Sequence, residues 1–205
     1  MENNVDRWLR LMGGPEWEGN EGRDRAICEM RALGTDTVFP LLAEKLSDPD
    51  LDSRCAAIEA IGQVDRERAV ELIVPLLQSS ESVVRWTACG VLGAPEARTA
   101  VGPLLTVLRD DTDPQIRNSA AWALGHIGDL VAIPALLQAL ASDHEEDIHC
   151  HTPSHCAATA LDDMLGTNHT RIRLSGSLCT MRPGSPDLES LREEAIQAYR
   201  SRAIP

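Results

Sequence analysis

The chain has 205 residues and a formal net charge of −13 at pH 7; 43% of its residues are hydrophobic and 3% are aromatic. An acidic protein repels phosphate backbones and anionic membrane surfaces, and no stretch reaches the roughly 20 apolar residues that span a bilayer. The first residues, MENNVDRWLR, lack the apolar core of a signal peptide. We therefore expect a cytoplasmic protein that binds neither nucleic acid nor membrane and whose six cysteines are reduced.

A short helix is predicted over residues 3–12, and a repeated sequence follows it. Four similar stretches each end in an apolar residue and a glycine: RAICEMRALG (25–34), RCAAIEAIG (54–62), RWTACGVLG (85–93) and RNSAAWALG (117–125). A period of about 31 residues indicates a solenoid, in which one unit cannot bury its apolar face alone. We predict an N-terminal cap over 1–20 and four repeats over 21–142.

Each repeat is predicted to hold a helix A, a short turn and a helix B. In the second repeat, helix A covers about 50–61, Gly62 follows as a C-terminal cap, and helix B covers about 67–78. The other predicted B helices cover about 37–46, 97–109 and 131–141. Prolines recur within helix B at Pro75, Pro103 and Pro134, and they predict a bend built into the repeat.

The repeat rhythm breaks after residue 142. The polar stretch SDHEEDIHCHTPSHC (142–156) leads into a helix over 156–166, and we interpret 143–166 as a degenerate fifth repeat with a His/Cys-rich loop. A segment with glycine and proline follows, and the last predicted helix covers about 187–200. Residues 167–205 are therefore predicted to form a C-terminal cap.

The pattern D-P-x-V-R-x-x-A-x-x-A-L-G is present in DPQIRNSAAWALG (113–125) and, more loosely, in DPDLDSRCAAIEAIG (48–62). It resembles the HEAT-like repeats first associated with phycobilisome lyases. The resemblance implies an all-α, HEAT-like α-solenoid: a right-handed superhelix of about five helix pairs with terminal caps. It also implies a non-catalytic scaffold or adaptor that grips a protein partner on its curved face. The alternatives are a phycobilin-lyase-like or chaperone-like factor for a cofactor-bearing protein, and a metal-dependent regulator that uses the His/Cys-rich loop.

Arginines open three of the repeats, at Arg54, Arg85 and Arg117, and stacking would align them as a ladder. Such a ladder could bind anions along one face. It could also tie neighbouring units together through ion pairs, and the structural interpretation is favoured because carboxylates lie about one helical turn ahead. These carboxylates belong to Asp50, Glu81 and Asp113.

Two tryptophans lie on one face of helix A in neighbouring repeats. Trp86 directly follows Arg85, and Trp122 lies five residues after Arg117. These two repeat positions are four residues apart, so they share one face of the helix. The indoles could form a binding patch or could pack between repeats. The predicted partner-binding residues are Trp86, Trp122, Asn118, Arg85 and Arg117.

Five of the six histidines lie between residues 144 and 169, together with Cys150 and Cys156. Imidazole and thiolate suit zinc, although the spacing matches no standard zinc motif. The candidate ligands are His149, His151, His155 and Cys156, with Cys179 as a further candidate. The alternatives are a solvated loop and adventitious metal affinity; no other cofactor is expected.

No catalytic residue is assigned from the sequence. The neighbouring pairs Cys150–His151 and His155–Cys156 would need a suitable geometry and an oxyanion site to act as nucleophile and base. A di-iron enzyme built from HEAT repeats, deoxyhypusine hydroxylase, uses His-Glu pairs at matching places in several repeats. This chain has a single such pair, His144-Glu145, in a predicted loop. We therefore expect that metal site to be absent.

Overall fold

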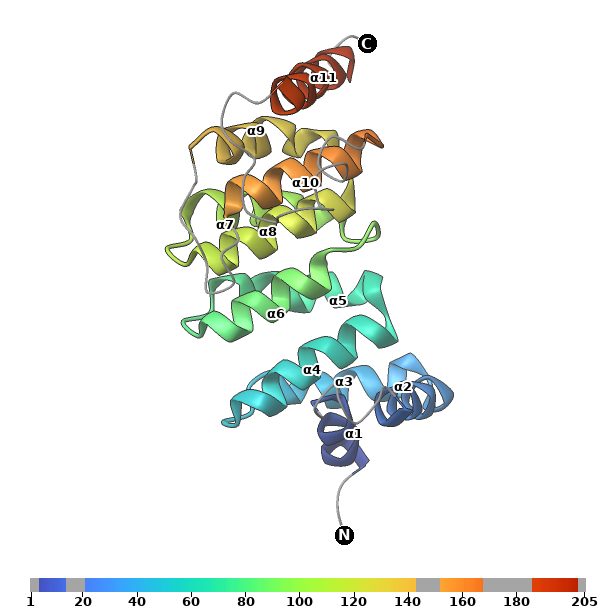
Figure 1. Cartoon of the computed structure of the whole chain (residues 1–205). Helices are drawn as coiled ribbons and strands as arrows, with labels where there is room; N and C mark the ends of the chain where they lie inside the picture. The colour runs from blue at the N-terminus through green and yellow to red at the C-terminus, as the bar shows by residue number, and fades with distance from the viewer. Residues whose placement is uncertain (1–3, 14–20, 143–151, 168–185, 203–205) are drawn as a thin grey trace. The chain divides into compact units, whose positions relative to one another are not determined.

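The computed structural model describes residues 4–13, 21–142, 152–167 and 186–202, and every regular element in these segments is a helix (Figure 1). This confirms the predicted all-α class. The chain divides into two compact units, Met1–Leu92 and Gly93–Pro205. None of the helices described is long and apolar enough to cross a membrane.

The first unit begins with a short helix that packs on the following helices, and antiparallel helix pairs come after it. α1 packs on α2 and α4, α3 packs on α4, and α4 packs on α6. The α5 helix continues as a 3₁₀ helix, η2, which packs on α6. The elements are α1 (Asn4–Met12), α2 (Glu21–Leu33), α3 (Thr35–Lys45), α4 (Leu51–Val64), α5 (Arg66–Ile73), η2 (Val74–Gln78) and α6 (Ser82–Leu92).

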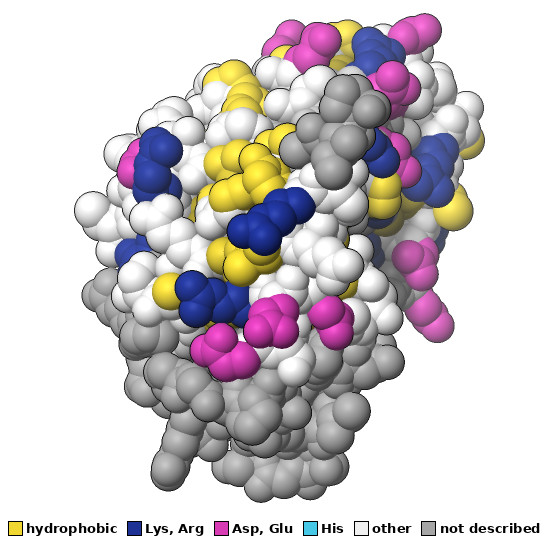
Figure 2. All heavy atoms as spheres, turned by 90° about the horizontal axis from the view of Figure 1, so that it is seen from above, with side chains coloured by type: hydrophobic (Ala, Val, Ile, Leu, Met, Phe, Trp, Pro, Cys, Tyr) yellow, Lys and Arg dark blue, Asp and Glu magenta, His cyan; other side chains and the backbone are white. Residues whose placement is uncertain are grey.

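The second unit is built around α8 and α10, which pack against each other, and α11 packs on α9 and α10 (Figure 1). Figure 2 looks onto the end that carries α11, where apolar, basic and acidic side chains are all exposed. The elements are η3 (Arg98–Ala100), α7 (Val101–Asp110), α8 (Pro114–Ile127), η4 (Leu130–Ala132), α9 (Ile133–Ser142), α10 (Pro153–Leu165) and α11 (Pro186–Arg202).

Small apolar side chains fill the core of both units. Alanines are fully buried in every A helix, for example Ala57 in α4, Ala88 in α6 and Ala120 in α8. A methyl side chain lets helix axes approach closely, and it loses no rotamer entropy on burial. The core therefore forms with few aromatic residues.

Gly62 does not cap its helix as predicted. α4 continues to Val64, and Asp65 follows it as the cap residue. A Cβ at position 62 would stand 2.3 Å from Cγ1 of Val91 in α6, so the absence of a side chain permits the close packing of the two helices. A left-handed cap does end α8, but at Gly128 (φ 70°) rather than at the glycine of the repeated sequence.

The helix B prolines lie where the helix type changes. Pro75 belongs to η2, which continues α5, whereas Pro103 and Pro134 lie in the first turns of α7 and α9, each preceded by a short 3₁₀ helix. A first turn has no intrahelical partner for its N–H groups, so proline removes no bond there. The predicted irregularity of helix B thus takes the form of junctions between 3₁₀ and α geometry.

Candidate functional site

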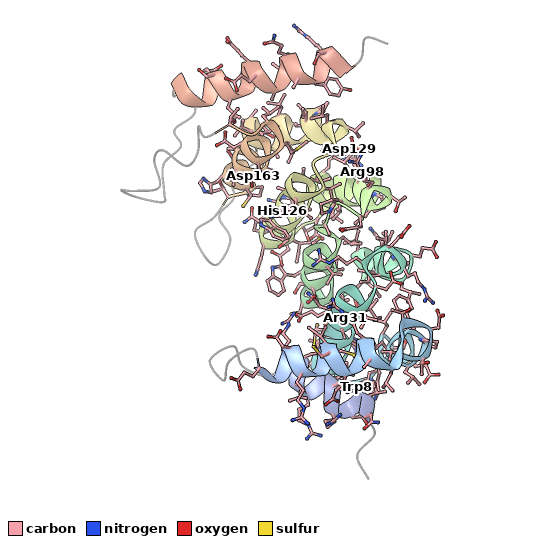
Figure 3. All side chains as sticks on the ribbon, turned by 90° about the vertical axis from the view of Figure 1, so that its right-hand side faces the viewer. Trp8, Arg31, Arg98, His126, Asp129 and Asp163 are labelled. Carbon is pink, nitrogen blue, oxygen red and sulfur yellow. The ribbon has the colours of Figure 1, made fainter. Side chains whose placement is uncertain are left out.

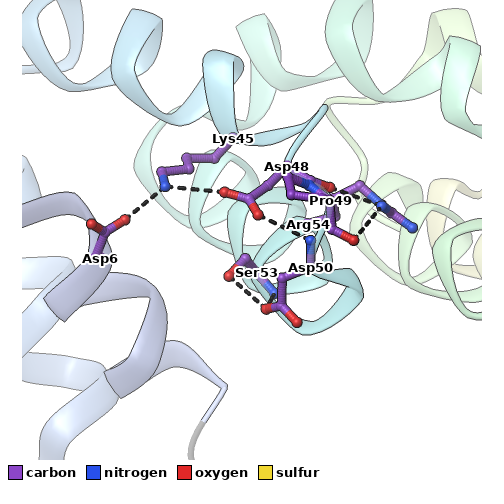
Figure 4. Close-up of polar contacts among 7 residues, drawn as sticks. All are labelled: Asp6, Lys45, Asp48, Pro49, Asp50, Ser53 and Arg54. Atoms are coloured by element: carbon purple, nitrogen blue, oxygen red, sulfur yellow. Dashed lines mark hydrogen bonds and ion pairs between the residues drawn. The ribbon is translucent and has the colours of Figure 1, made fainter.

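The ladder arginines close the turn that precedes their own helix. Arg54 Nη1 donates to the carbonyl oxygens of Asp48 (2.8 Å) and Pro49 (3.4 Å), as Figure 4 shows. Arg85 Nη1 donates to the carbonyl of Ser79 at 3.0 Å, and Arg117 Nη1 donates to that of Asp111 at 2.9 Å. In all three repeats the acceptor lies six residues before the arginine.

The residue that offers this carbonyl also folds the turn with its side chain. Asp48 Oδ1 accepts from the N–H of Asp50 at 3.0 Å, and Asp111 Oδ1 accepts from the N–H of Asp113 at 3.0 Å. In the third repeat, Ser79 Oγ accepts from the N–H of Glu81 at 3.3 Å. The same turn is therefore built three times.

Two of the three carboxylates expected to pair with the ladder arginines, those of Asp50 and Asp113, serve as helix caps. Asp50 accepts from the N–H of Ser53 at 2.9 Å, and Asp113 accepts from the N–H of Gln115 at 2.9 Å. Each satisfies one of the N–H groups that a helix start leaves unbonded.

Other arginines join neighbouring repeats of the first unit. Arg68 pairs with Asp36 at 2.7 Å, Arg23 pairs with Glu59 at 2.9 Å, and Arg31 Nη2 donates to the carbonyl of Gln63 at 2.7 Å. The bonds from the ladder arginines to these backbone carbonyls, by contrast, lie within a repeat.

Trp86 projects from α6 with 47% of its surface exposed, and Val83, one turn earlier, is 46% exposed. One turn later stands Gly90, where an added Cβ would meet no atom within 4 Å. Buried neighbours on the opposite face, such as Val84 and Ala88, anchor the helix. The indole therefore borders open space on an uncharged helix face.

Trp122 projects from α8, is 45% exposed, and is held by its neighbours. A Cβ at Gly93 would lie 2.5 Å from Cζ3 of the indole, so the ring rests on this glycine. On its own helix the indole stacks against His126, with ring centroids 3.9 Å apart and planes tilted by 32°. His126 Nδ1 in turn lies 3.0 Å from the Trp122 carbonyl oxygen.

The remaining predicted contact residues are more buried. Arg117 is 8% exposed and Asn118 is 6% exposed, whereas Arg85 is half-buried. The exposed part of the predicted patch therefore consists of Trp86 and Trp122, and a contact role for the other three stays a prediction. Sequence reasoning missed His126, although its spacing of four residues from Trp122 on a helix was a usable signal.

The predicted zinc ligands lie only partly within the described residues. His149, His151 and Cys179 lie outside them, as do Cys150 and the His144-Glu145 pair. His155 and Cys156 begin α10, where their N–H groups donate to the Oγ1 and carbonyl oxygen of Thr152, each at 3.1 Å. Within the described segments, no group of three or more His, Cys, Asp or Glu side chains could hold a metal ion. Zinc binding stays a prediction.

A polar groove of about 490 Å³ lies beside the start of α4. Lys45 Nζ bridges Asp6 of α1 at 2.7 Å and Asp48 at 3.1 Å, and the hydrogen bond to Asp6 is the main cause of the raised pKa of Lys45 (Figure 4). The pKa of Asp48 is lowered, chiefly because its carboxylate accepts from the N–H of Asp50. The bridge fastens the N-terminal helix to the first repeat.

The chain is similar to two curated proteins over much of its length. It is 38% identical over 123 residues to deoxyhypusine hydroxylase-B of Oryza sativa subsp. japonica, across 60% of this chain. That match spans 40% of the rice enzyme. The chain is also 27% identical over 168 residues to an uncharacterized phycocyanin operon protein Z of Pseudanabaena tenuis, covering 77% of this chain and 81% of that protein.

Comparison with solved structures supports the fold. An engineered protein superposes with a TM-score of 0.53 at 18% identity, covering 98% of both chains. The sequence profile of HEAT repeats matches residues 18–86 and 70–149, which is more than half of the chain. These matches, together with the helix pairs and the thrice-repeated arginine turn, show that the chain belongs to the HEAT repeat family.

Proposed function

We propose that this chain is a non-catalytic protein-binding module that engages its partner through Trp86 and Trp122. The observation that carries the proposal is their exposure, 47% and 45%, on helices that begin successive repeats. Trp8, by contrast, is 2% exposed and packs in the core. Tryptophan on a surface is enriched among the residues that dominate binding energy, because it offers a large apolar area and one donor.

The surroundings of the two indoles favour binding over simple exposure. Gly93 and His126 hold Trp122 in place, so its side chain loses little rotamer freedom when a partner binds. Beside Trp86, the open position at Gly90 leaves room for a partner side chain to lie against the indole. Trp122 is thus preorganised for binding, and Trp86 is accessible to a partner.

A double variant, Trp86→Ala with Trp122→Ala, tests the proposal by affinity capture of the partner from the native cell. We expect a partner held by wild type to bind the variant at least about 30-fold more weakly, since two central aromatic contacts are lost. The matched control is Leu33→Ala with Val131→Ala, two exposed apolar residues outside α6 and α8. Val131 lines a groove of about 360 Å³ between α7 and α9. A partner lost from the control but kept by the double variant would place the contact elsewhere and contradict the proposal.

A second candidate is a lyase-like or chaperone-like factor for a cofactor-bearing protein. The similarity to the phycocyanin operon protein, over 77% of this chain, favours it. In that case the captured partner would absorb visible light. A colourless partner would remove this candidate and leave the binding module.

A metal-dependent regulator is the remaining proposal from the sequence, with His149, His151, His155 and Cys156 as zinc ligands. Metal analysis of the purified chain, and its melting temperature with and without a chelator, test it. A bound ion should stabilise the fold by mass action, so the chelator should lower the melting temperature. An unchanged melting temperature without bound zinc would reject the metal site. The cytoplasmic location likewise stays a prediction.

A further inference from the structure

The exposed face of α8 around Trp122 consists of uncharged polar groups and two aromatic rings. We call this set the Trp122 face; its members share one stripe of the helix and are Gln115, Ser119, Trp122 and His126. Trp122 and His126 are exposed, and the other two are half-buried. The indole is thus the largest apolar surface in a polar stripe.

Three arginines of the second unit, in η3, α7 and α8, are bound to other groups or lie on the other side of the unit. Arg117, the arginine of α8, is 8% exposed and donates to the carbonyl of Asp111. Arg109 forms two bonds to the carboxylate of Asp110, at 2.8 and 2.7 Å. Figure 3 shows Arg98 on the opposite side of the second unit from His126.

An acidic group lies on the same side as the Trp122 face. Figure 3 shows Asp163 of α10 on the side that carries His126, and Asp163 is exposed. α8 and α10 are in close contact there, because a Cβ at Gly125 would lie 2.8 Å from Cα of Ala160. With the net charge of −13, this arrangement places an exposed carboxylate on the same side of the second unit as the Trp122 face.

We propose that the Trp122 face receives a basic segment of the partner protein, with an arginine or lysine side chain stacked on the Trp122 indole. This rests on the proposed function and adds the chemistry of the partner. Tryptophan is the best aromatic acceptor for a cation, and acidic surroundings raise the local concentration of a basic segment.

Two other occupants fit the face less well. An apolar helix would bury the Gln115 side chain against groups that cannot bond to it, which costs free energy. A second copy of this chain would bring together two proteins that each carry a net charge of −13. A basic segment can instead bond to the polar groups while its cation covers the indole.

The test uses a peptide of alternating arginine and glycine, the same peptide with citrulline in place of arginine, and the same peptide with glutamate. Citrulline keeps the shape of arginine and removes the charge. Binding to the full chain is followed by titration calorimetry at about 0.15 M ionic strength and at lower salt, where charge contacts strengthen. The variants are Trp122→Leu, Trp122→Phe and the control Val131→Ala.

We expect the arginine peptide to bind more tightly than the citrulline peptide, and the glutamate peptide not to bind. Trp122→Leu should weaken arginine-peptide binding by about 2- to 30-fold, Trp122→Phe by less, and Val131→Ala not at all. Equal binding of the arginine and citrulline peptides would overturn the proposal, and this comparison needs no variant to fold. Equal binding to wild type and a folded Trp122→Leu variant would overturn it as well. If the native partner is lost from the double tryptophan variant while the arginine peptide shows no preference, the proposed function stands and the basic partner is wrong.

Discussion

Gly125 of α8 lies directly against Ala160 of α10: a Cβ at position 125 would stand 2.8 Å from both Cα and Cβ of that alanine. The obstructing Cα belongs to the backbone, so it cannot move away by changing a rotamer. The equivalent glycine of the second repeat, Gly62, lies against a side chain instead, since an added Cβ would stand 2.3 Å from Cγ1 of Val91. The glycines that end the second and fourth repeated sequences therefore permit the close spacing between successive A helices.

Gly125→Ala should lower the free energy of unfolding by about 1–3 kcal/mol, because an added methyl overpacks a backbone contact. Gly90→Ala should raise it by about 0.5–1 kcal/mol, since that position is open and alanine is the better helix former. Urea unfolding of the two variants measures both values. If both variants changed the free energy of unfolding in the same direction, helix propensity rather than helix spacing would determine the effect of replacing these glycines.

Arg117→Ala should lower the free energy of unfolding by about 1–3 kcal/mol, because it leaves the carbonyl of Asp111 without its charged donor in a nearly buried setting. The matched control is Arg25→Ala. Its side chain is 72% exposed and forms an ion pair with Glu29 one turn away, which predicts a loss below about 0.5 kcal/mol. Thermal unfolding of both variants provides the comparison. Equal losses would mean that the arginine turn contributes no more than a surface pair.

The attachment of the N-terminal helix to the first repeat should weaken in acid. The pKa of Glu29 is lowered below its ordinary value of 4.5, first because the indole N–H of Trp8 donates to its carboxylate, and further because Arg25 and Arg7 lie nearby. A group with a lowered folded-state pKa contributes stability above its ordinary value and loses that contribution as pH falls through the folded-state pKa. The stabilisation is therefore present at neutral pH and is lost below 4.5.

Glu29→Gln checks this directly, since the amide can still accept from Trp8 but carries no charge. Melting temperatures measured from about pH 7 down to about pH 3 should show the variant below wild type at neutral pH, with the two curves meeting in acid. A constant gap at every pH would mean that packing, not the charge of Glu29, holds α1 on α2.

The sequence pattern predicted the helices well, because apolar periodicity is a local property. The second helix A was expected over 50–61 and runs from Leu51 to Val64. The partner of Arg54 was not predictable in the same way, because every residue has a backbone carbonyl and the sequence does not mark which one accepts the bond. The contact of Trp122 with Gly93 joins residues 29 positions apart and depends on how closely α8 packs, which no local pattern encodes.

His126 should matter to binding without mattering to stability. Its exposed ring covers one side of the Trp122 indole, so His126→Ala leaves the fold intact within about 0.5 kcal/mol but lets the indole change rotamer. Fixing that rotamer again on binding costs about 0.5–1.5 kcal/mol, which predicts a 2- to 12-fold loss of partner affinity while the tryptophan itself is retained. Val131→Ala, an exposed apolar residue outside α6 and α8, is the control for a small change that leaves Trp122 in place. Because the chain has four tryptophans, the measurement pairs partner affinity with the fluorine NMR linewidth of Trp122 in chains labelled with fluorotryptophan. A more mobile indole with unchanged affinity would show that Trp122 binds by area alone and gains nothing from being held.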